Sequence, residues 1–158
     1  MNTQALKIAY KIKTVPIQAI VKHLHACDSC FSPPLSTYVD IDAYGKKIYE
    51  KSVTFEAWNG KELIGLLAAY YNDKKTKTGF ITNVSVLKEH QHTGIASRLI
   101  ESVINFGKKE SLTKLLLEIN RSNTSAIHLY RKCGFKETEK NRHSFTMCLD
   151  LTLLKEKK

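Results

Sequence analysis

The sequence predicts an α/β fold of the α+β kind, in which helices cover both faces of a mixed and mostly antiparallel twisted sheet of about six to seven strands. Three observations support this prediction. Apolar residues alternate with a period of two from residue 52, a helical stripe at 95–109 separates two strand-like runs, and a second hairpin pattern follows residue 135. A chain of 158 residues, 42% of them hydrophobic, suits one core, so a single domain over residues 1–158 is expected.

The first third of the chain is predicted to form one strand and two helices. ALKIAY, residues 5–10, is the expected strand, and a helix is expected to follow from Thr14, whose hydroxyl would cap it. This helix should end before the two prolines at 33–34. Asp40 or Asp42 would then cap a second helix. The apolar residues that share a face of that helix are Ile41, Tyr44 and Ile48.

Three consecutive strands are predicted in the middle of the chain. SVTFEAW at 52–58 alternates in polarity, Asn59-Gly60 is a typical two-residue hairpin turn, and ELIGLLAAYY at 62–71 continues as the partner strand. GFITNVSVL at 79–87 follows as the third strand.

A parallel pair of strands is predicted at the centre of the sheet. KLLLEI at 114–119 is a short apolar run that we expect to be buried on both faces. A helix to about residue 109 connects it to the strand at 79–87, so a crossover would make these two strands parallel neighbours. The residues of the helical stripe are Ile95, Leu99, Val103 and Phe106.

The end of the chain is predicted to form a helix and a hairpin. The helix covers about residues 123–133 and ends on Gly134 as a left-handed C-terminal cap. FKETE and SFTMCLDL then supply the two strands of a hairpin over about 135–152.

Charge and composition limit the classes of function. The chain has 25 basic and 15 acidic residues, a net +10, and such a field attracts any polyanion without selecting one. Specific nucleic-acid binding is not expected, because the sequence has neither a basic stripe with interleaved aromatics nor a recognition helix.

The sequence also has no apolar run of about 18 residues and no secretory signal, so we expect a cytoplasmic protein without membrane contact. Its four cysteines are expected to be free thiols.

One segment has the composition of a metal site. HLHACDSC places His23, His25, Cys27 and Cys30 within eight residues, and all four are zinc-ligand types. On a helix, however, residues 23, 25 and 27 point in diverging directions and cannot converge on one ion. No metal is therefore expected.

The segment HQHTGIASR, residues 90–98, has the features of an anion site. It lies between the third strand and the long helix, where the first N–H groups of a helix lack acceptors and the helix dipole favours a negative charge. Gly94 would let the backbone approach a ligand closely. The segment is thus a candidate phosphate site in which the main chain does the binding.

Two blocks of sequence resemble a known family. Residues 91–96, which follow Val84-Ser85-Val86, resemble the Q/R-x-x-G-x-G/A pyrophosphate loop of the GNAT superfamily of acetyl-CoA-dependent N-acetyltransferases. NRSNTSAIHLYRKCGF at 120–135 is similar to the family's N-x-x-N-x-x-A-x-x-L-Y-x-K-x-G-F segment in order, spacing and placement after a buried strand. The two blocks together are far more specific than either alone, whereas the first 50 residues match only in outline.

The resemblance implies roles for individual residues. The strand backbone at Val84, Ser85 and Val86 would bind the pantetheine arm of acetyl-CoA, where the two parallel strands splay apart. Asn123 would hold the arm from the other side, and Tyr130 would protonate the departing sulfur, since a tyrosine of ordinary pKa, about 10, keeps its proton at neutral pH. The amides expected to hold the pyrophosphate belong to Gln91, His92, Thr93, Gly94, Ile95 and Ala96.

The general base is not assigned from the sequence. Many relatives carry a carboxylate on the strand before the pyrophosphate loop, near the positions of Thr82 and Asn83, and neither of these can act as a base. Ordered water or a carboxylate from elsewhere, such as Asp40, Asp42 or Glu56, would have to take the proton, unless the amine binds already deprotonated. His90 and the neighbouring His92 are expected to contact the cofactor or solvent.

The resemblance implies a GNAT fold and acetyl transfer from acetyl-CoA to a primary amine through a ternary complex. The acceptor is expected to be a small molecule, bound by helices over about 14–51, the CFSPPLSTY loop and the turn at 70–73; the cofactor would lie against a core over about 52–135. The alternatives are a non-catalytic acyl-CoA-binding regulatory domain and an enzyme that acetylates protein N-termini or lysines. A homodimer is expected, because domains of this type often pair.

Overall fold

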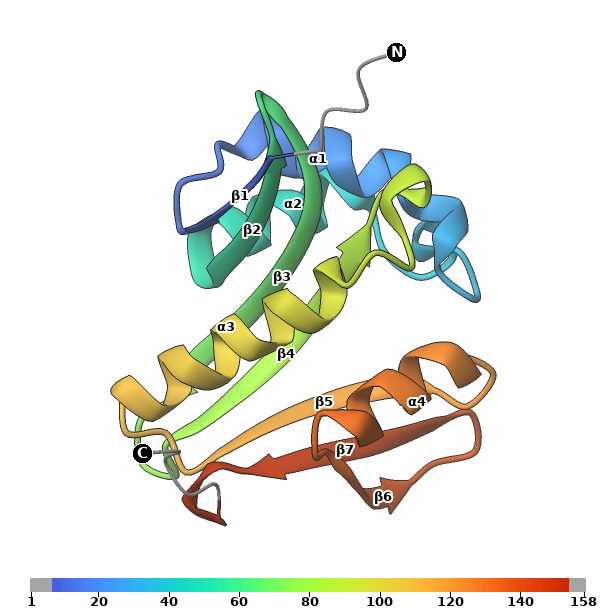
Figure 1. Cartoon of the computed structure of the whole chain (residues 1–158). Coiled ribbons are helices and arrows are strands. Elements are labelled where there is room, and N and C mark those ends of the chain that lie inside the picture. The colour runs from blue at the N-terminus through green and yellow to red at the C-terminus, as the bar shows by residue number, and fades with distance from the viewer. Residues whose placement is uncertain (1–6, 154–158) are drawn as a thin grey trace.

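The computed structural model, which describes residues 7–153, has the predicted architecture (Figure 1). A seven-stranded sheet has the order β1-β2-β3-β4-β5-β7-β6, and every neighbouring pair is antiparallel except β4 and β5, which are parallel. Its strands are β1 (Ile8–Ile12), β2 (Val53–Asn59), β3 (Glu62–Asp73), β4 (Thr78–Val86), β5 (Lys114–Asn120), β6 (Lys136–Lys140) and β7 (Ser144–Asp150). Within the described range, no helix is long and apolar enough to span a bilayer.

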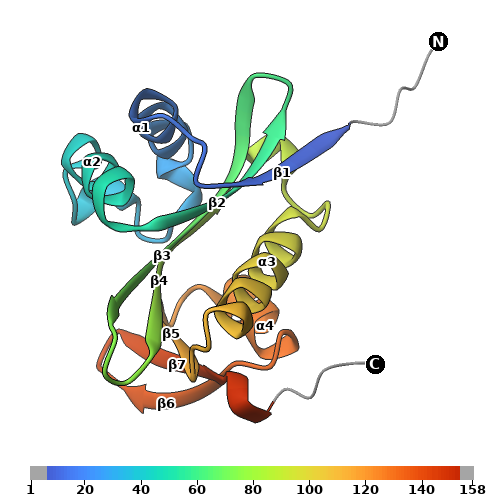
Figure 2. The same ribbon diagram turned by 90° about the vertical axis from the view of Figure 1, so that its left-hand side faces the viewer.

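Four α-helices cover the sheet, two on each face (Figure 2). The helices are α1 (Ile17–Ala26), α2 (Ile41–Lys51), α3 (Ile95–Lys109) and α4 (Thr124–Lys132). Under α1 and α2, Ile20, Leu24 and Ile48 pack in one apolar cluster with Trp58 and Leu66. Because side chains alternate between the faces of a strand, the same strands also line a second cluster under α3 and α4. The sheet is therefore buried on both sides where the helices lie.

The first helix begins later than expected. Thr14 does not cap it: its backbone N–H and its hydroxyl both donate to the carboxylate of Glu56, and α1 begins at Ile17 after Pro16. Pro16 suits this position because it lacks an N–H that the helix would leave unpaired. The second helix is capped as predicted, with Asp40 accepting a hydrogen bond from the Ala43 N–H at 3.0 Å.

The central hairpin is confirmed, but its turn is shifted by one residue. Asn59 pairs with Glu62, so the two loop residues are Gly60 and Lys61. Gly60 has φ +60°, whereas Lys61 does not have a positive φ. A positive φ at the first loop residue alone is the pattern of a type II′ turn, which takes glycine there.

The parallel pair is confirmed, but β5 is not buried on both faces. Leu115, Leu117 and Ile119 are buried, whereas Glu118 is exposed and Leu116 is half-buried. The helices α1 and α2 do not extend over this part of the sheet (Figure 2), so alternate residues of β5 remain accessible. The last helix and the terminal hairpin follow the prediction, with Gly134 at φ +102° after α4.

The two parallel strands separate towards the site. Thr78 to Ile81 pair with Lys114 to Leu117, and no further pair is formed between β4 and β5 in the described chain. On its other edge β4 skips one residue at this point, because Ala68 pairs with Asn83 and Ala69 with Ile81. Such a bulge at Thr82 bends a strand and redirects its side chains. The bulge thus accounts for the V-shaped gap between β4 and β5 (Figure 1).

Candidate functional site

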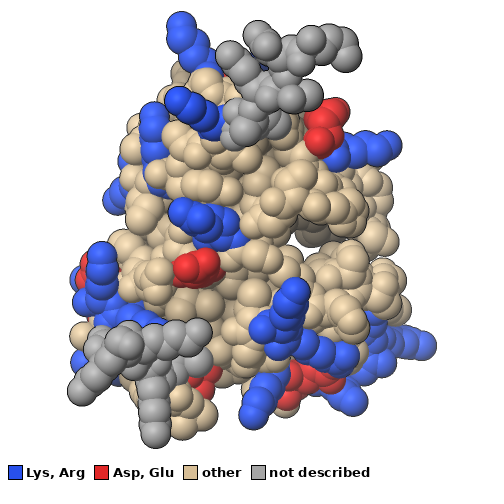
Figure 3. All heavy atoms as spheres, in the orientation of Figure 1, with Lys and Arg blue, Asp and Glu red and all other residues tan. Residues whose placement is uncertain are grey.

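The gap between β4 and β5 holds two adjoining cavities of about 210 and 330 Å³. Both are lined by Val84, Val86, Gln91, Asn123 and Tyr130. The larger cavity extends over the start of α3, and the smaller one reaches the loop between α1 and α2. The space-filling view shows an opening between the upper and lower halves of the molecule (Figure 3). A ligand in the larger cavity can therefore meet one that enters from the α1–α2 side.

The start of α3 presents a group of backbone donors. The first helical hydrogen bond is from Arg98 N to the Gly94 carbonyl, at 3.1 Å, and no side chain caps the helix. Among the described residues, no acceptor is found for the N–H groups of His92, Thr93, Gly94, Ile95, Ala96 and Ser97. These donors meet at a helix N-terminus that faces the larger cavity, which is the arrangement that favours an anion.

Gln91 differs from its predicted role. Its backbone N–H is not free, because it donates to the Lys88 carbonyl at 3.3 Å. Its side chain instead donates to the carbonyl of Val86 at 3.1 Å, which ties the loop to the end of β4. The set of free donors therefore begins at His92, one residue later than predicted.

Gly94 is suited to close approach by a ligand. Its φ is +88°, and a Cβ built on it would meet no atom within 4 Å. His92 also has a positive φ, +63°. Two left-handed residues so close together turn successive N–H groups towards one concavity, as in anion-binding nests.

The last residues of β4 present both a free backbone edge and a set of side chains. Beyond Ile81, the backbone of β4 has no partner on β5, so the groups of Val84 and the N–H of Val86 are available to an extended ligand, whereas the Val86 carbonyl already accepts from Gln91. Ser85 points to the other face, where its hydroxyl lies 3.0 Å from His23 Nε2. Its side chain thus supports the strand from behind.

Asn123 lines both cavities but is partly engaged. Its side-chain oxygen accepts a hydrogen bond from the Ala126 N–H at 3.3 Å and caps α4. The side-chain amide group is left for a ligand.

Tyr130 is buried at the junction of the two cavities. The residue is 7% exposed, and its ring packs edge-on against Phe135 with centroids 5.6 Å apart. Its hydroxyl forms no hydrogen bond within the described chain. Burial raises its pKa far above the ordinary value, so the hydroxyl keeps its proton at neutral pH. At neutral pH the hydroxyl therefore has a hydrogen that it can offer to a ligand.

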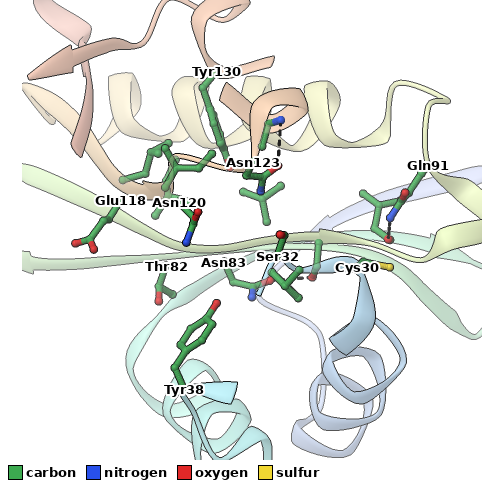
Figure 4. Close-up of a pocket in the computed structure, with 18 residues that line it drawn as sticks. Cys30, Ser32, Tyr38, Thr82, Asn83, Gln91, Glu118, Asn120, Asn123 and Tyr130 are labelled. Atoms are coloured by element: carbon green, nitrogen blue, oxygen red, sulfur yellow. Dashed lines mark hydrogen bonds between the residues drawn. The ribbon is translucent and has the colours of Figure 1, made fainter. Parts of the chain in front are cut away.

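Four polar residues without an individually predicted role line the smaller cavity (Figure 4). Ser32 and Tyr38 belong to the CFSPPLSTY loop that was expected to contact the acceptor, whereas no such role was predicted for Glu118 and Asn120 on β5. Tyr38 and Tyr130 lie on opposite sides of the strands in this view. Glu118 accepts a hydrogen bond from the Ser144 hydroxyl at 3.1 Å. Because side chains alternate along a strand, the position of Glu118 between Leu117 and Ile119 could have indicated that it lies on the exposed face of β5. We instead expected both faces of this strand to be buried, and Glu118 was therefore not considered.

The carboxylates considered from the sequence do not line either cavity. Asp40 caps α2, and Asp42 accepts a hydrogen bond from His25 at 2.7 Å. Glu56 is fully buried; burial opposes its ionisation, but hydrogen bonds from Thr14, Thr54 and Trp58 prevail and lower its pKa. Glu56 is thus a structural group, and the cavity takes its carboxylate from Glu118.

A buried polar chain supports the wall of the smaller cavity. His23, 2% exposed, lies 3.1 Å from the Leu63 carbonyl through Nδ1 and 3.0 Å from the Ser85 hydroxyl through Nε2. Ser85 in turn hydrogen-bonds the side chain of Asn83 at 2.8 Å. Burial lowers the pKa of His23 to about 4, so the ring is neutral, and Nδ1–H must donate because the carbonyl only accepts. These polar side chains hold Asn83 in place from the side of the sheet on which α1 lies.

Two histidines of HLHACDSC have protein partners in the structure. Among the residues that the structure describes, no three His, Cys, Asp or Glu side chains are grouped to hold an ion. His23 serves the polar chain, and His25 pairs with Asp42 instead.

Comparison with known proteins gives a consistent result. A family model described as "Acetyltransferase (GNAT) family" matches residues 18–135. The chain is 31% identical over 127 residues to the uncharacterized N-acetyltransferase YsnE of Bacillus subtilis, covering 78% of this chain and 80% of that protein. It is 27% identical over 149 residues to spermidine N(1)-acetyltransferase of Escherichia coli K12, covering 87% and 79%.

Two further matches differ in extent. The chain is 33% identical over 70 residues to an N-alpha-acetyltransferase of Sulfurisphaera tokodaii, covering 44% of this chain and only 42% of that protein. Among solved structures, PaiA N-acetyltransferase of Thermoplasma acidophilum in complex with coenzyme A has a TM-score of 0.70 at 15% identity, covering 90% of this chain and 99% of that one. At such low identity the likeness bears on the fold.

Proposed function

The chain belongs to the GNAT family of acetyltransferases and is an acetyl-CoA-dependent acyltransferase, and we propose that it acetylates the primary amine of a small molecule within a ternary complex. The observation that carries this proposal is the pair of adjoining cavities with Tyr130 at their junction. One cavity has free main-chain donors for a pyrophosphate, and the other carries a carboxylate.

Acetyl-CoA supplies the acetyl group as a thioester, and the larger cavity suits it. We expect the N–H groups from His92 to Ala96 to hold the pyrophosphate, because they are free and lie at a helix N-terminus. The free backbone groups of β4, those of Val84 and the N–H of Val86, would hydrogen-bond the pantetheine amides, with the Asn123 amide opposite. Gln91 contributes through its side chain, which holds the loop against β4.

The chemistry follows from the positions of two side chains. The amine nitrogen attacks the thioester carbon, a C–N bond forms, and the C–S bond breaks. Tyr130, which is protonated at neutral pH and lines both cavities, gives its proton to the sulfur that takes the electron pair of the C–S bond. Glu118 takes the proton from the amine, directly or through one water. Glu118 therefore replaces the carboxylate that Thr82 and Asn83 do not provide.

A thiol-release assay over a panel of amines, with mass spectrometry of the products, tests this proposal. Glu118→Gln should lower kcat/KM by about 10²-fold or more, because a positioned base contributes this much, and should leave coenzyme A affinity unchanged. Glu139→Gln, a similar change on an exposed face of β6, is the matched control. The panel includes a peptide with a free N-terminus and an internal lysine.

Two outcomes would favour the alternatives. Coenzyme A binding by calorimetry without turnover of any amine would indicate a regulatory acyl-CoA-binding domain. Turnover of the peptide alone would indicate an enzyme that modifies proteins.

A further inference from the structure

Resting on the proposed amine acetylation, we infer that the acceptor carries one cationic group, the reacting amine, and that polycationic amines are poor substrates. The part of the acceptor that does not react would meet the charges that line the smaller cavity and those of the hollow beyond it.

The smaller cavity contains a single charge. Eighteen residues line it (Figure 4), and among the described residues Glu118 is the one with a charged side chain. The other polar residues that line it are uncharged, and they include Ser32, Tyr38, Thr82, Asn83 and Asn120. One ammonium can pair with Glu118 on entry. A second ammonium would lose water there without gaining a carboxylate.

Other carboxylates on this side of the sheet have partners of their own. Asp28 accepts from both the backbone N–H and the hydroxyl of Ser36, at 2.7 and 2.6 Å. Asp40 is used by the start of α2, and Asp42 by His25. The additional ammonium groups of a polycationic acceptor would have to compete with these protein donors for the three carboxylates.

The hollow next to the cavity is lined by one lysine, Lys114, and one carboxylate, Asp73. It lies along the same two strands, has a volume of about 500 Å³ and is lined by Tyr70, Phe80, Lys114 and Leu116, among others. Lys47 does not line the hollow, but its ammonium lies 5.4 Å from the centre of the ring of Tyr70, which does. The carboxylate in this hollow, Asp73, accepts a hydrogen bond from the Thr76 N–H at 3.0 Å, and the charge of Lys114 is among the causes that lower its pKa, so Lys114 partly offsets its negative charge.

The distance between these charges matches the length of a polyamine. Lys114 precedes Glu118 by four residues on β5, which corresponds to about 13 Å along a strand. If the reacting amine is at Glu118, a distal ammonium extended along β4 and β5 approaches Lys114. Like charges at that range repel, whereas an amide or a carboxylate would be accepted or attracted.

Three acceptors of equal length test the inference: 1,6-diaminohexane, 6-aminohexanamide and 6-aminohexanoate. They share the reacting amine and differ only in the distal charge. We expect kcat/KM for the diamine to be at least about tenfold below that for the amide, and the carboxylate to match or exceed the amide. Spermidine should be as poor as the diamine. The differences should shrink as salt rises, because the charges are partly exposed.

A charge reversal identifies the source of the effect. Lys114→Glu should raise kcat/KM for the diamine relative to the amide by about three- to tenfold. Lys61→Glu changes the net charge equally but lies in the turn at the opposite end of β3, so it should leave the ratio unchanged. Lys114→Gln, which adds no negative charge beside Asp73, should give a smaller change in the same direction.

Binding of the same three amines to the coenzyme A complex, by calorimetry, separates this inference from the proposed function. The same order of affinities without any turnover would overturn the proposed function and support the charge selectivity. A diamine or spermidine that binds or reacts as well as the amide would overturn the selectivity, whatever the turnover. So would a failure of all three amines to bind.

Discussion

Tyr130 and Tyr71 are both largely removed from solvent, and neither hydroxyl has a hydrogen-bond partner among the described residues. They differ in their surroundings. Tyr130 lines both cavities, whereas Tyr71 packs against Phe106 with ring centroids 5.2 Å apart. A free hydroxyl beside a cavity is available to a ligand. A free hydroxyl inside the core has no such use and lowers the stability of the fold. The pair therefore offers a test of function with its own control.

Tyr130→Phe should lower kcat by about 10²- to 10⁴-fold, because the hydroxyl acts on charge that develops only as the C–S bond breaks. The KM for acetyl-CoA and the melting temperature should change little, since the ring still packs on Phe135. Tyr71→Phe should leave kcat unchanged and keep or raise stability. Steady-state kinetics and thermal unfolding check both variants. A Tyr130→Phe enzyme that keeps more than half of the wild-type kcat, when chemistry limits the rate, would contradict the assignment.

Gly94→Glu should abolish coenzyme A binding while the protein remains folded. The added carboxylate lies beside an anion, and its side chain occupies the space that the backbone leaves open. Gly94→Ala is the control for backbone strain alone, since alanine at φ +88° costs about 1 kcal/mol and adds no charge. Calorimetry with coenzyme A should show a much larger loss for Glu than for Ala. Equal losses would show that strain, and not charge, disturbs the site.

At the residue scale, the sequence predicts groups that carry a motif and misses those that depend on an exposed face. Gly94 and Tyr130 stand in blocks of fixed spacing, and the loop and helix around them form as expected. Glu118 stands in an apolar run. Glu118 is exposed because α1 and α2 leave this part of β5 uncovered. The packing of helices on a strand is a tertiary property, which the local sequence pattern does not predict.

At the scale of elements, α1 is held to the sheet by a neutral buried histidine. His23 joins α1 to the Leu63 carbonyl on β3 and to Ser85 on β4. At the other end of α1, a long-range partner also takes a polar side chain. The Thr14 hydroxyl, which could have capped the helix, donates to Glu56 instead. Long-range polar partners of this kind decide helix boundaries that local signals leave open.

Stability should fall as pH decreases from about 6.5 to 4. The pKa of His23 is about 4 in the folded chain and about 6.5 when unfolded, so the unfolded chain takes up the proton first. The contribution of His23 to the free energy of unfolding is complete at pH values above its pKa in the unfolded chain. It is lost as the pH falls towards its pKa in the folded chain, and the loss amounts to up to about 3 kcal/mol. Urea unfolding at several pH values measures the slope.

Two variants assign this pH dependence. His23→Gln keeps a donor and an acceptor but does not titrate, so it should flatten the slope in this range, at a cost of about 1–3 kcal/mol at pH 7. His128→Gln on the exposed face of α4 should leave the slope as it is. An unchanged slope in His23→Gln would mean that other groups cause the pH dependence.

At the scale of the molecule, one sheet connects two functional layers. The layer of α3 and α4 lies beside the larger cavity, and the layer of α1 and α2 lies beside the smaller one. Six strands of this sheet were predicted from their own apolar patterns, whereas β6, which has no apolar residue, was predicted only as one arm of the terminal hairpin. The separation of β4 from β5 was implied only by resemblance. It depends on the bulge at Thr82, which no composition signal marks.

We predict that the whole described chain unfolds as a single domain. Phe55 and Trp58 belong to the same strand but to different apolar clusters, so neither layer can lose its packing without exposing β2. Trp58 is the one tryptophan of the chain and reports on the α1–α2 layer, whereas coenzyme A is expected to bind beside α3 and α4. Unfolding followed by Trp58 fluorescence and by circular dichroism should give coincident transitions. Coenzyme A at 100 times its Kd should shift both by the same amount, about 2.7 kcal/mol. A fluorescence transition that ignores coenzyme A, while the dichroism transition moves, would mean that the two layers unfold separately.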